Sequence, residues 1–254
     1  MLTLRWETDV PQDRVSSSQD TPHRDHVSSL SDDVSETLHE LAAEIKPRLR
    51  GWLHAGILPL TVAAGIVLVS LSPGVGAKVA SAIFILSATL LFGVSAVYHT
   101  GTWQPRVKML LKRFDHSNIF LLIAGSYTAF SVLLLEAGDA TVLLTLVWSG
   151  AVLGVAFRVF WLEAPRWLYV PVYIALGWAA VFWMPQFAER SPTSVVVLLV
   201  VGGLLYSLGA LVYAFKRPDP APRWFGFHEI FHSFTIAAFI VHYIGVSIAV
   251  HSMR

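Results

Sequence analysis

Two histidines four residues apart begin the last apolar segment of the chain. His228 and His232 lie in the stretch RWFGFHEIFHSF, residues 223–234. This spacing places both imidazoles on one face of a helix, one turn apart, where they can bind the same metal ion. A pair of histidines that only packs or hydrogen-bonds would look the same, so the metal interpretation depends on further groups at the same depth.

The composition indicates the environment of this pair. The chain has 254 residues, of which 55% are hydrophobic and only 14% charged, and its mean hydropathy is +0.60. A soluble domain of this size carries far more charge, so we predict a membrane protein. The chain has no cysteine, which excludes disulfides, thiolate metal sites and thiol nucleophiles. Histidine, aspartate and glutamate remain as candidate metal ligands.

Apolar runs of about 20 residues recur along the chain, and this is the length that a helix needs to cross the hydrocarbon core. Backbone polar groups in lipid must be satisfied within the segment, so the runs are expected to be helices. The sequence therefore predicts an all-α membrane protein, a seven-transmembrane helix bundle formed by residues 51–254. The runs cover approximately 52–71, 77–100, 115–135, 140–162, 167–185, 193–215 and 227–250.

The residues before the bundle have a different composition. Residues 1–33 are rich in Ser and Asp and poor in large apolar residues, which predicts a disordered cytoplasmic tail. Residues 34–50 place Leu38, Leu41 and Ile45 at helical spacing and predict an amphipathic helix at the membrane interface. The region up to residue 51 and the second, fourth and sixth connections carry fifteen of the eighteen Lys and Arg residues. Positive residues stay inside, so we predict a cytoplasmic N-terminus and a C-terminus outside.

With this orientation, polar residues from three spans converge at one membrane depth. Ser95 and His99 close the second span on the inner side. Asp115 opens the third span at the same level, and His228 and His232 open the seventh. Ionisable groups within spans are costly and usually face the bundle interior or a wet cavity. The sequence therefore predicts one polar site near the cytoplasmic end of the bundle.

Three imidazoles and a carboxylate fit Zn²⁺. Three protein ligands with water in the fourth position form the open arrangement of catalytic zinc sites, and zinc makes this water a source of hydroxide at neutral pH. Asp115 can hold the water, act as general base or fix an imidazole tautomer, but it can also simply cap the third helix. Ser95 can hydrogen-bond water, substrate or an oxyanion, or bond back to its own helix.

Four other polar residues are given structural roles. His242 lies about 21 Å along the helix axis from the start of the histidine pair, at 1.5 Å per residue, and is expected to hydrogen-bond within the bundle. His54 is near the right depth but has no partner at a ligand spacing, so an interfacial role is expected. His116 must point away from the neighbouring carboxylate, and Arg158 is expected to reach the cytoplasmic surface.

The segment HEIFH, residues 228–232, also matches H-E-x-x-H, in which the glutamate is the base of zinc metalloproteases. An intramembrane protease of the site-2 type takes its third ligand from an aspartate in a later helix. No acidic residue follows His232 in this chain. The protease interpretation is therefore less favoured than a hydrolase of lipid amide or ester bonds.

Three segments carry a family resemblance: SAVYHT closing the second span, FDHSNIFLLIAGSYTAF in the third and FHEIFHSFTIAAFIVHYIGV in the seventh. In this order they resemble the progestin and adipoQ receptor superfamily, specifically its bacterial haemolysin-III-like branch, over residues from about 46 to 250. The resemblance implies a seven-helix fold with the N-terminus inside and an intramembrane zinc near the cytoplasmic face. The implied ligands are His99, His228 and His232, with Asp115 and Ser95 beside the metal water.

The function expected from the residues is zinc-dependent hydrolysis of a lipid amide or ester, with a membrane lipid as substrate. The resemblance to a bacterial branch implies a location in the plasma membrane of a bacterium. The resemblance adds that eukaryotic relatives are receptors whose zinc centre is associated with ceramide-type amide hydrolysis, whereas the bacterial name suggests membrane lysis. Two alternatives stay open: a pore-forming or lytic protein with structural zinc, and a lipid-sensing receptor without turnover. No nucleic-acid partner is expected, and no protein partner is indicated.

Overall fold

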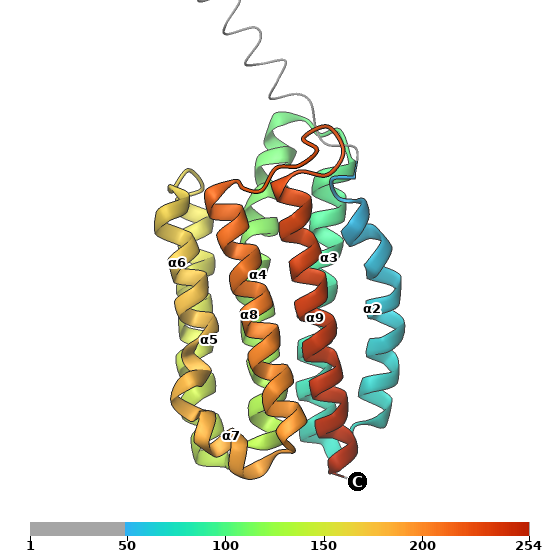
Figure 1. Ribbon diagram of the computed structural model, residues 1–254, viewed down its shortest axis with the longest axis vertical. Helices are drawn as coiled ribbons and strands as arrows, with labels where there is room; N and C mark the ends of the chain where they lie inside the picture. Colours follow the sequence, from blue (N-terminus) through green and yellow to red (C-terminus); the bar gives the residue numbers. More distant parts are fainter. Residues whose placement is uncertain (1–48, 254) are drawn as a thin grey trace, which may run out of the picture. The chain divides into compact units, whose positions relative to one another are not determined.

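The computed structural model describes residues 49–253, and these residues form helices and connections without a strand (Figure 1). Seven helical segments are long and apolar enough to cross a membrane, which confirms the predicted all-α seven-span bundle of an integral, multi-pass membrane protein. The direction of the bundle across the membrane stays a prediction. The elements are α2 (Trp52–Leu71), α3 (Gly74–Thr100), α4 (Pro105–Leu134), α5 (Ala137–Phe160), α6 (Arg166–Gly177), the 3-10 turn η1 (Ala179–Trp183), α7 (Met184–Arg190), α8 (Thr193–Phe215) and α9 (Phe227–Ser252).

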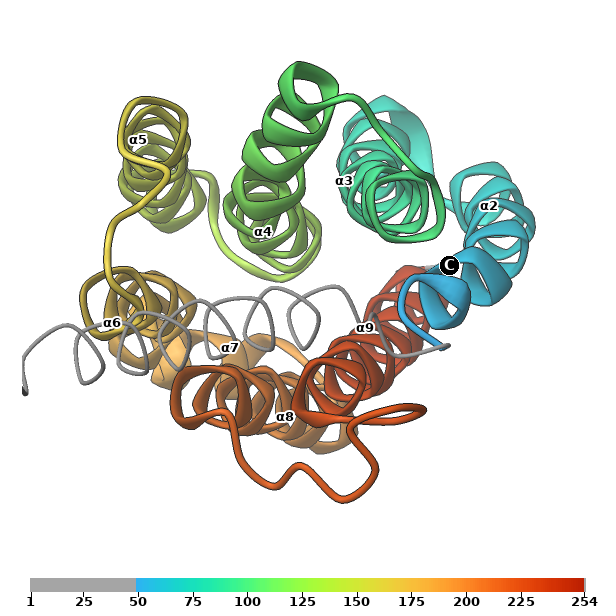
Figure 2. The same ribbon diagram turned by 90° about the horizontal axis from the view of Figure 1, so that it is seen from above.

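The spans follow one another around a ring in chain order, and α9 closes the ring against α2 (Figure 2). Helix α4 also contacts α6 and α9 across the ring. Accordingly 78% of its apolar window is buried within the protein, against 17% for α8. Gly125 of α4 packs so closely on α3 that a Cβ there would lie 2.1 Å from the Ser87 hydroxyl oxygen. Helices α3, α4 and α9 therefore supply the inner wall of the bundle.

The third span begins ten residues earlier than the sequence indicated. We expected residues 101–113 to form a connection, but α4 starts at Pro105 and runs without interruption to Leu134. Proline suits the first turn of a helix because its missing N–H would be unpaired there anyway. The charged residues of this extension are outside the apolar window, so a hydropathy pattern cannot detect that the helix continues through them.

The fifth span is broken, whereas we expected one helix over 167–185. It consists of α6, η1 and α7, with the break after Gly177. The Tyr127 hydroxyl donates to the Gly177 carbonyl at 2.8 Å and accepts the Ala180 N–H at 2.7 Å. Non-helical backbone within a membrane needs such partners. A side chain of the central helix α4 thus satisfies the interrupted backbone of its neighbour.

The predicted tail, 1–33, and the predicted interfacial helix up to residue 48 lie outside the described residues. The last two residues of that predicted helix, Leu49 and Arg50, form a turn that leads into α2.

Candidate metal centre

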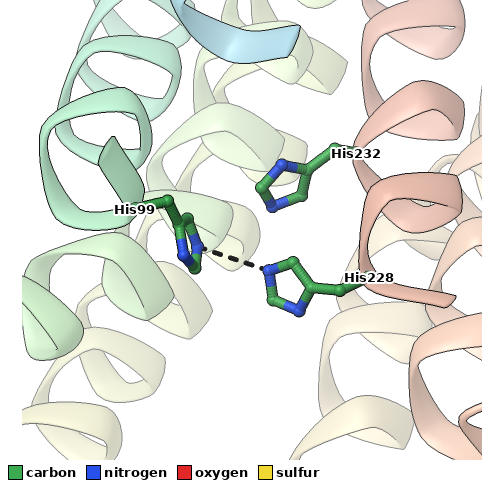
Figure 3. A group of neighbouring side chains, drawn as sticks. All are labelled: His99, His228 and His232. Carbon is green, nitrogen blue, oxygen red and sulfur yellow. Dashed lines mark hydrogen bonds between the residues drawn. The ribbon is translucent and has the colours of Figure 1, made fainter. Parts of the chain in front are cut away.

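The ends of two distant helices bring three imidazoles together at the same end of the bundle. His99 lies in the last turn of α3, and His228 and His232 lie in the first two turns of α9. Figure 3 shows the two α9 rings facing His99 across a small gap. His99 Nε2 is 3.3 Å from His228 Nε2, and one nitrogen from each of the three rings lies within 4.8 Å of the others.

The donor set fits a divalent transition metal. Tetrahedral zinc with Zn–N bonds of about 2.0–2.1 Å places its ligand nitrogens roughly 3.4 Å apart, close to the 3.3 Å between His99 and His228. His232 is 2% exposed, and its Nδ1 has no hydrogen-bond partner among the described residues. Three imidazoles without a cysteine or a crowd of carboxylates favour zinc over calcium or magnesium, which prefer oxygen ligands.

Asp115 lies on the ligand side of this cluster. Its Oδ2 is 3.7 Å from His99 Nε2, the same nitrogen that faces His228. A carboxylate that fixed the tautomer of His99 would instead contact the other ring nitrogen. The Ser95 hydroxyl lies in the same cavity wall as the Asp115 carboxylate. The position of Asp115 suits a group that contacts a metal water better than one that orients a ligand.

The alternative that Asp115 caps its helix is wrong. Helix α4 begins at Pro105, so Asp115 is almost three turns inside the helix and far from its unpaired N–H groups. A carboxylate in this position gains nothing from helix capping. Its half-buried place beside His99 therefore needs another explanation.

Glu229, the glutamate of HEIFH, is fully buried and bonds groups outside the histidine cluster. Its Oε1 accepts a 3.0 Å ion-paired hydrogen bond from Arg50 Nε, and its Oε2 accepts the Gly226 N–H at 2.9 Å. Both carboxylate oxygens therefore accept hydrogen bonds that stabilise the start of α9. Because the metalloprotease interpretation needs this side chain as a free base, the structure gives it no support.

His54 is a neighbour of the cluster that the sequence interpretation missed. We expected an interfacial role, but the residue is only 2% exposed. Its ring stacks on His232 with centroids 3.9 Å apart and planes within 11°. Neither of its ring nitrogens has a hydrogen-bond partner in the described part of the chain. The sequence feature that could have identified His54 is its depth in the first span. A search for ligand spacings within one helix does not take depth into account.

The structure also places the remaining polar residues. His242 donates from Nε2 to the Leu199 carbonyl at 3.2 Å, as expected for a residue bonded within the bundle. His116 does not point away from Asp115: its Nδ1 lies 3.9 Å from the carboxylate and bonds the Lys112 carbonyl. Arg158 is not at the surface.

Arg158 is 1% exposed and lies at the end of α5. Its guanidinium donates to the carbonyls of Trp161 and Leu162 and lies 4.2 Å from the centre of the Tyr169 ring. A cation at a helix C-terminus is stabilised by the last carbonyls, so Arg158 can stay buried with no carboxylate partner among residues 49–253.

A narrow cavity of about 130 Å³ opens from the histidine cluster into the bundle. Its wall includes His228 and His242, which are fourteen residues apart on α9, so it extends about 21 Å along that helix. A second cavity of about 160 Å³ shares Tyr127, Trp178 and His242 with it. Apart from the histidines, Asp115 and a few hydroxyls, apolar and aromatic side chains line both spaces.

Known proteins resemble this chain over the same region. Residues 43–243 match the family described as haemolysin-III related. A hemolysin-3 homolog of Bacillus subtilis is 35% identical over 155 residues, which cover 61% of this chain and 69% of that protein. Hemolysin-3 of Bacillus cereus is 32% identical over 56% of this chain and 64% of its own length.

A more distant relative is eukaryotic. An adiponectin receptor protein of Drosophila melanogaster is 28% identical over 67% of this chain but only 42% of its own length. The seven-span bundle and the Bacillus relatives together support a location in the bacterial plasma membrane. With four fifths of its length matched by the family, the chain belongs to the haemolysin-III-related proteins, within the progestin and adipoQ receptor superfamily.

Proposed function

We propose that the protein is a zinc-dependent hydrolase of lipid amide or ester bonds, acting at the cytoplasmic side of the bilayer. The observation that carries the proposal is the position of the Asp115 carboxylate, 3.7 Å from His99 Nε2, beside three imidazoles that can hold one cation. This combination lies at one end of an apolar cavity in a membrane protein. A nucleophile generated there would meet the carbonyl of a lipid rather than that of a soluble substrate.

The proposed roles follow from the geometry. His99, His228 and His232 would hold the metal, and a bound Zn²⁺ supplies an acidified water and a positive charge near the developing oxyanion. Asp115 takes the proton from the attacking water and delivers it to the leaving amine or alkoxide. The products are then a fatty acid and an amine or alcohol. Ser95, in the same cavity wall as Asp115, would hydrogen-bond to the carboxylate or to the attacking water.

The cavity provides the binding energy for the substrate. An acyl chain lying along α9 from His228 towards His242 would be surrounded by apolar and aromatic side chains. Burial of each methylene contributes roughly 0.8 kcal/mol, so a chain of moderate length is held without charged contacts. The carbonyl at its end would then lie beside the histidine cluster.

The test uses purified, zinc-loaded protein and a panel of ceramides, N-acyl amines and glycerolipid esters, with products detected by mass spectrometry. We expect release of fatty acid from at least one class, lost in His232→Ala and in Asp115→Asn. Absence of turnover across the panel, with the metal bound, would contradict the proposal.

The names of the relatives favour two other functions. The Bacillus proteins are called haemolysins, which suggests membrane lysis, with a metal that only stabilises the bundle. Dye release from liposomes without any change in their lipids would favour lysis. The Drosophila relative is called a receptor, and a lipid that raises the melting temperature without being converted would favour that role.

A further inference from the structure

The first turn of α2, with the two residues before it, touches both helices that carry the histidine cluster. Gly51 has φ +86°, and a Cβ there would lie 2.7 Å from the Cβ of His99 and 3.1 Å from the Thr100 backbone nitrogen. Only glycine permits both this backbone conformation and this close approach to the end of α3. The chain therefore enters α2 pressed against the helix end that carries the first imidazole.

Arg50 ties the same turn to α9. Its Nε donates to Glu229, which lies next to His228 in the chain and is fully buried. Glu229 in turn accepts the Gly226 N–H. A buried carboxylate held on both oxygens fixes the first turn of α9, and with it the direction in which His228 points.

His54 continues this contact one turn further along α2. Its ring lies between Phe92 of α3, with centroids 5.0 Å apart, and His232 of α9, at 3.9 Å. Phe92 is fully buried and cannot move aside. The His232 ring is thus held on one face by a flat partner that is itself held by the core.

The stacking geometry shows that His54 is not a fourth ligand. An imidazole binds a metal in the plane of its ring, with a bond of about 2.0–2.1 Å. The two rings are nearly parallel, within 11°, and their centroids are 3.9 Å apart. A cation in the plane of His232 would therefore lie above the plane of His54, where that ring has no lone pair to offer. His54 acts on the site through His232.

We infer that the first turn of α2 is a positioning element of the metal centre, in which His54 fixes the plane of His232 by stacking while Arg50 and Gly51 hold the adjoining helix ends. The inference rests on the metal site of the proposed function, but it does not depend on which reaction the site performs. Groups that orient metal ligands typically contribute 10–100-fold to metal affinity. His54 is therefore a positioning residue and not a catalytic one.

The test distinguishes the contribution of the flat ring of His54 from the contribution of its nitrogen atoms. His54→Phe keeps an aromatic ring between Phe92 and His232, whereas His54→Ala removes it. His242→Ala is the matched control, because it deletes another buried imidazole, one on α9 that bonds the Leu199 carbonyl. Zinc affinity of each full-length variant is measured by competition with a chromogenic chelator. Co²⁺ absorption reports the geometry of the site without any need for activity.

We expect His54→Ala to bind zinc 10–100-fold more weakly, with altered Co²⁺ bands. His54→Phe and His242→Ala should bind close to wild type. If His54→Ala does not fold, His54→Leu, which fills the space without a flat ring, is expected to show the same loss.

If His54→Ala binds zinc as tightly as wild type, the inference is overturned and the proposed function stays intact. The same holds for His54→Leu if that variant is used because His54→Ala does not fold. An equal loss in His54→Phe would also overturn it, because the nitrogens rather than the ring would then be required. If the wild-type protein binds neither Zn²⁺ nor Co²⁺, the inference and the proposed metal site both fail.

Discussion

Helix α9 carries buried histidines at two depths, and their surroundings are opposite. His232 lies against three other imidazoles, those of His54, His228 and His99, with ring centroids 3.9, 4.5 and 5.3 Å away. His242 has no other imidazole around it in the described residues; it bonds the Leu199 carbonyl and contacts the rings of Phe130 and Tyr206. Burial alone therefore does not distinguish a structural histidine from a candidate ligand.

The difference lies in how the polar atoms are satisfied. A single buried imidazole needs only one carbonyl acceptor, and His242 has it. Several neutral imidazoles with nitrogens facing one another satisfy few hydrogen bonds unless a cation or a polar ligand lies between them. Crowding of this kind is stable when something binds, which supports the proposed metal at the end of the bundle with the histidine cluster. The level of His242, by contrast, is packed around a single bonded imidazole.

Two Arg–Glu pairs among the described residues differ in how far they are buried. Arg50–Glu229, beside the cluster, joins a one-quarter exposed guanidinium to a fully buried carboxylate. Arg190–Glu136 joins the α7 and α5 ends with side chains that are 45% and 63% exposed. Exposed pairs contribute little to stability, whereas removal of one partner from a buried pair leaves an uncompensated charge.

The largest effect is expected for Asp115→Asn. Loss of the proton acceptor should lower lipid hydrolysis by about 10²–10⁴-fold, because this is the usual contribution of a general base. Zinc content should stay at the wild-type level, since Asp115 lies beside the ligands and is not one of them. Product formation and metal content are measured on the same samples, with Arg190→Ala, which changes an exposed side chain outside the cavity, as control. Full activity in Asp115→Asn would mean that the carboxylate plays no part in proton transfer.

A smaller effect is expected when the ion pairs are broken. Arg50→Ala should lower the free energy of unfolding by roughly 2–3 kcal/mol, somewhat less than for a fully buried pair because Arg50 is partly exposed. Arg190→Ala should cost less than about 1 kcal/mol. Unfolding in detergent compares the two variants. Equal losses of unfolding free energy in Arg50→Ala and Arg190→Ala would contradict the expected difference between the buried and the exposed pair.

The double variant Arg50→Ala/Glu229→Gln sharpens this comparison. Because glutamine removes the uncompensated charge and can still accept the Gly226 N–H, the double variant should be more stable than Arg50→Ala alone. If it is less stable, the cost of Arg50→Ala does not come from the buried carboxylate.

The smallest effect on the metal is expected for His242→Ala. The lost hydrogen bond and the space left behind should reduce stability by about 1–3 kcal/mol, while zinc affinity stays unchanged. Chelator competition and thermal unfolding of one preparation give both values. A weakened metal site in this variant would show that the two depths are energetically coupled, against the separation argued above.

The sequence was sufficient for the features that depend on composition and depth. Apolar run lengths predict seven spans, and the ends of those spans place His99, His228 and His232 at one level, where the structure brings them together. This works because a membrane fixes how deep each residue of a helix lies. Depth does not fix which way a side chain points around its helix.

Features that depend on tertiary packing could not be read from the sequence. The charged start of α4 looks like a connection, so Asp115 was mistaken for a possible cap. His54 has no ligand-like spacing, because its partner is on another helix. Arg158 can be buried because it donates to two carbonyls of the connection after α5. No local sequence pattern predicts the path of that connection. The break after Gly177 depends on a hydroxyl fifty residues away in the chain.

Metal analysis of the purified full-length protein tests the central claim most directly. Wild type and His242→Ala should each carry about one zinc per chain, as expected for a site with three protein ligands, and the triple variant His99→Ala/His228→Ala/His232→Ala should carry almost none. Equal metal content in the triple variant and wild type, or no metal in a wild-type protein prepared with zinc present, would contradict the account.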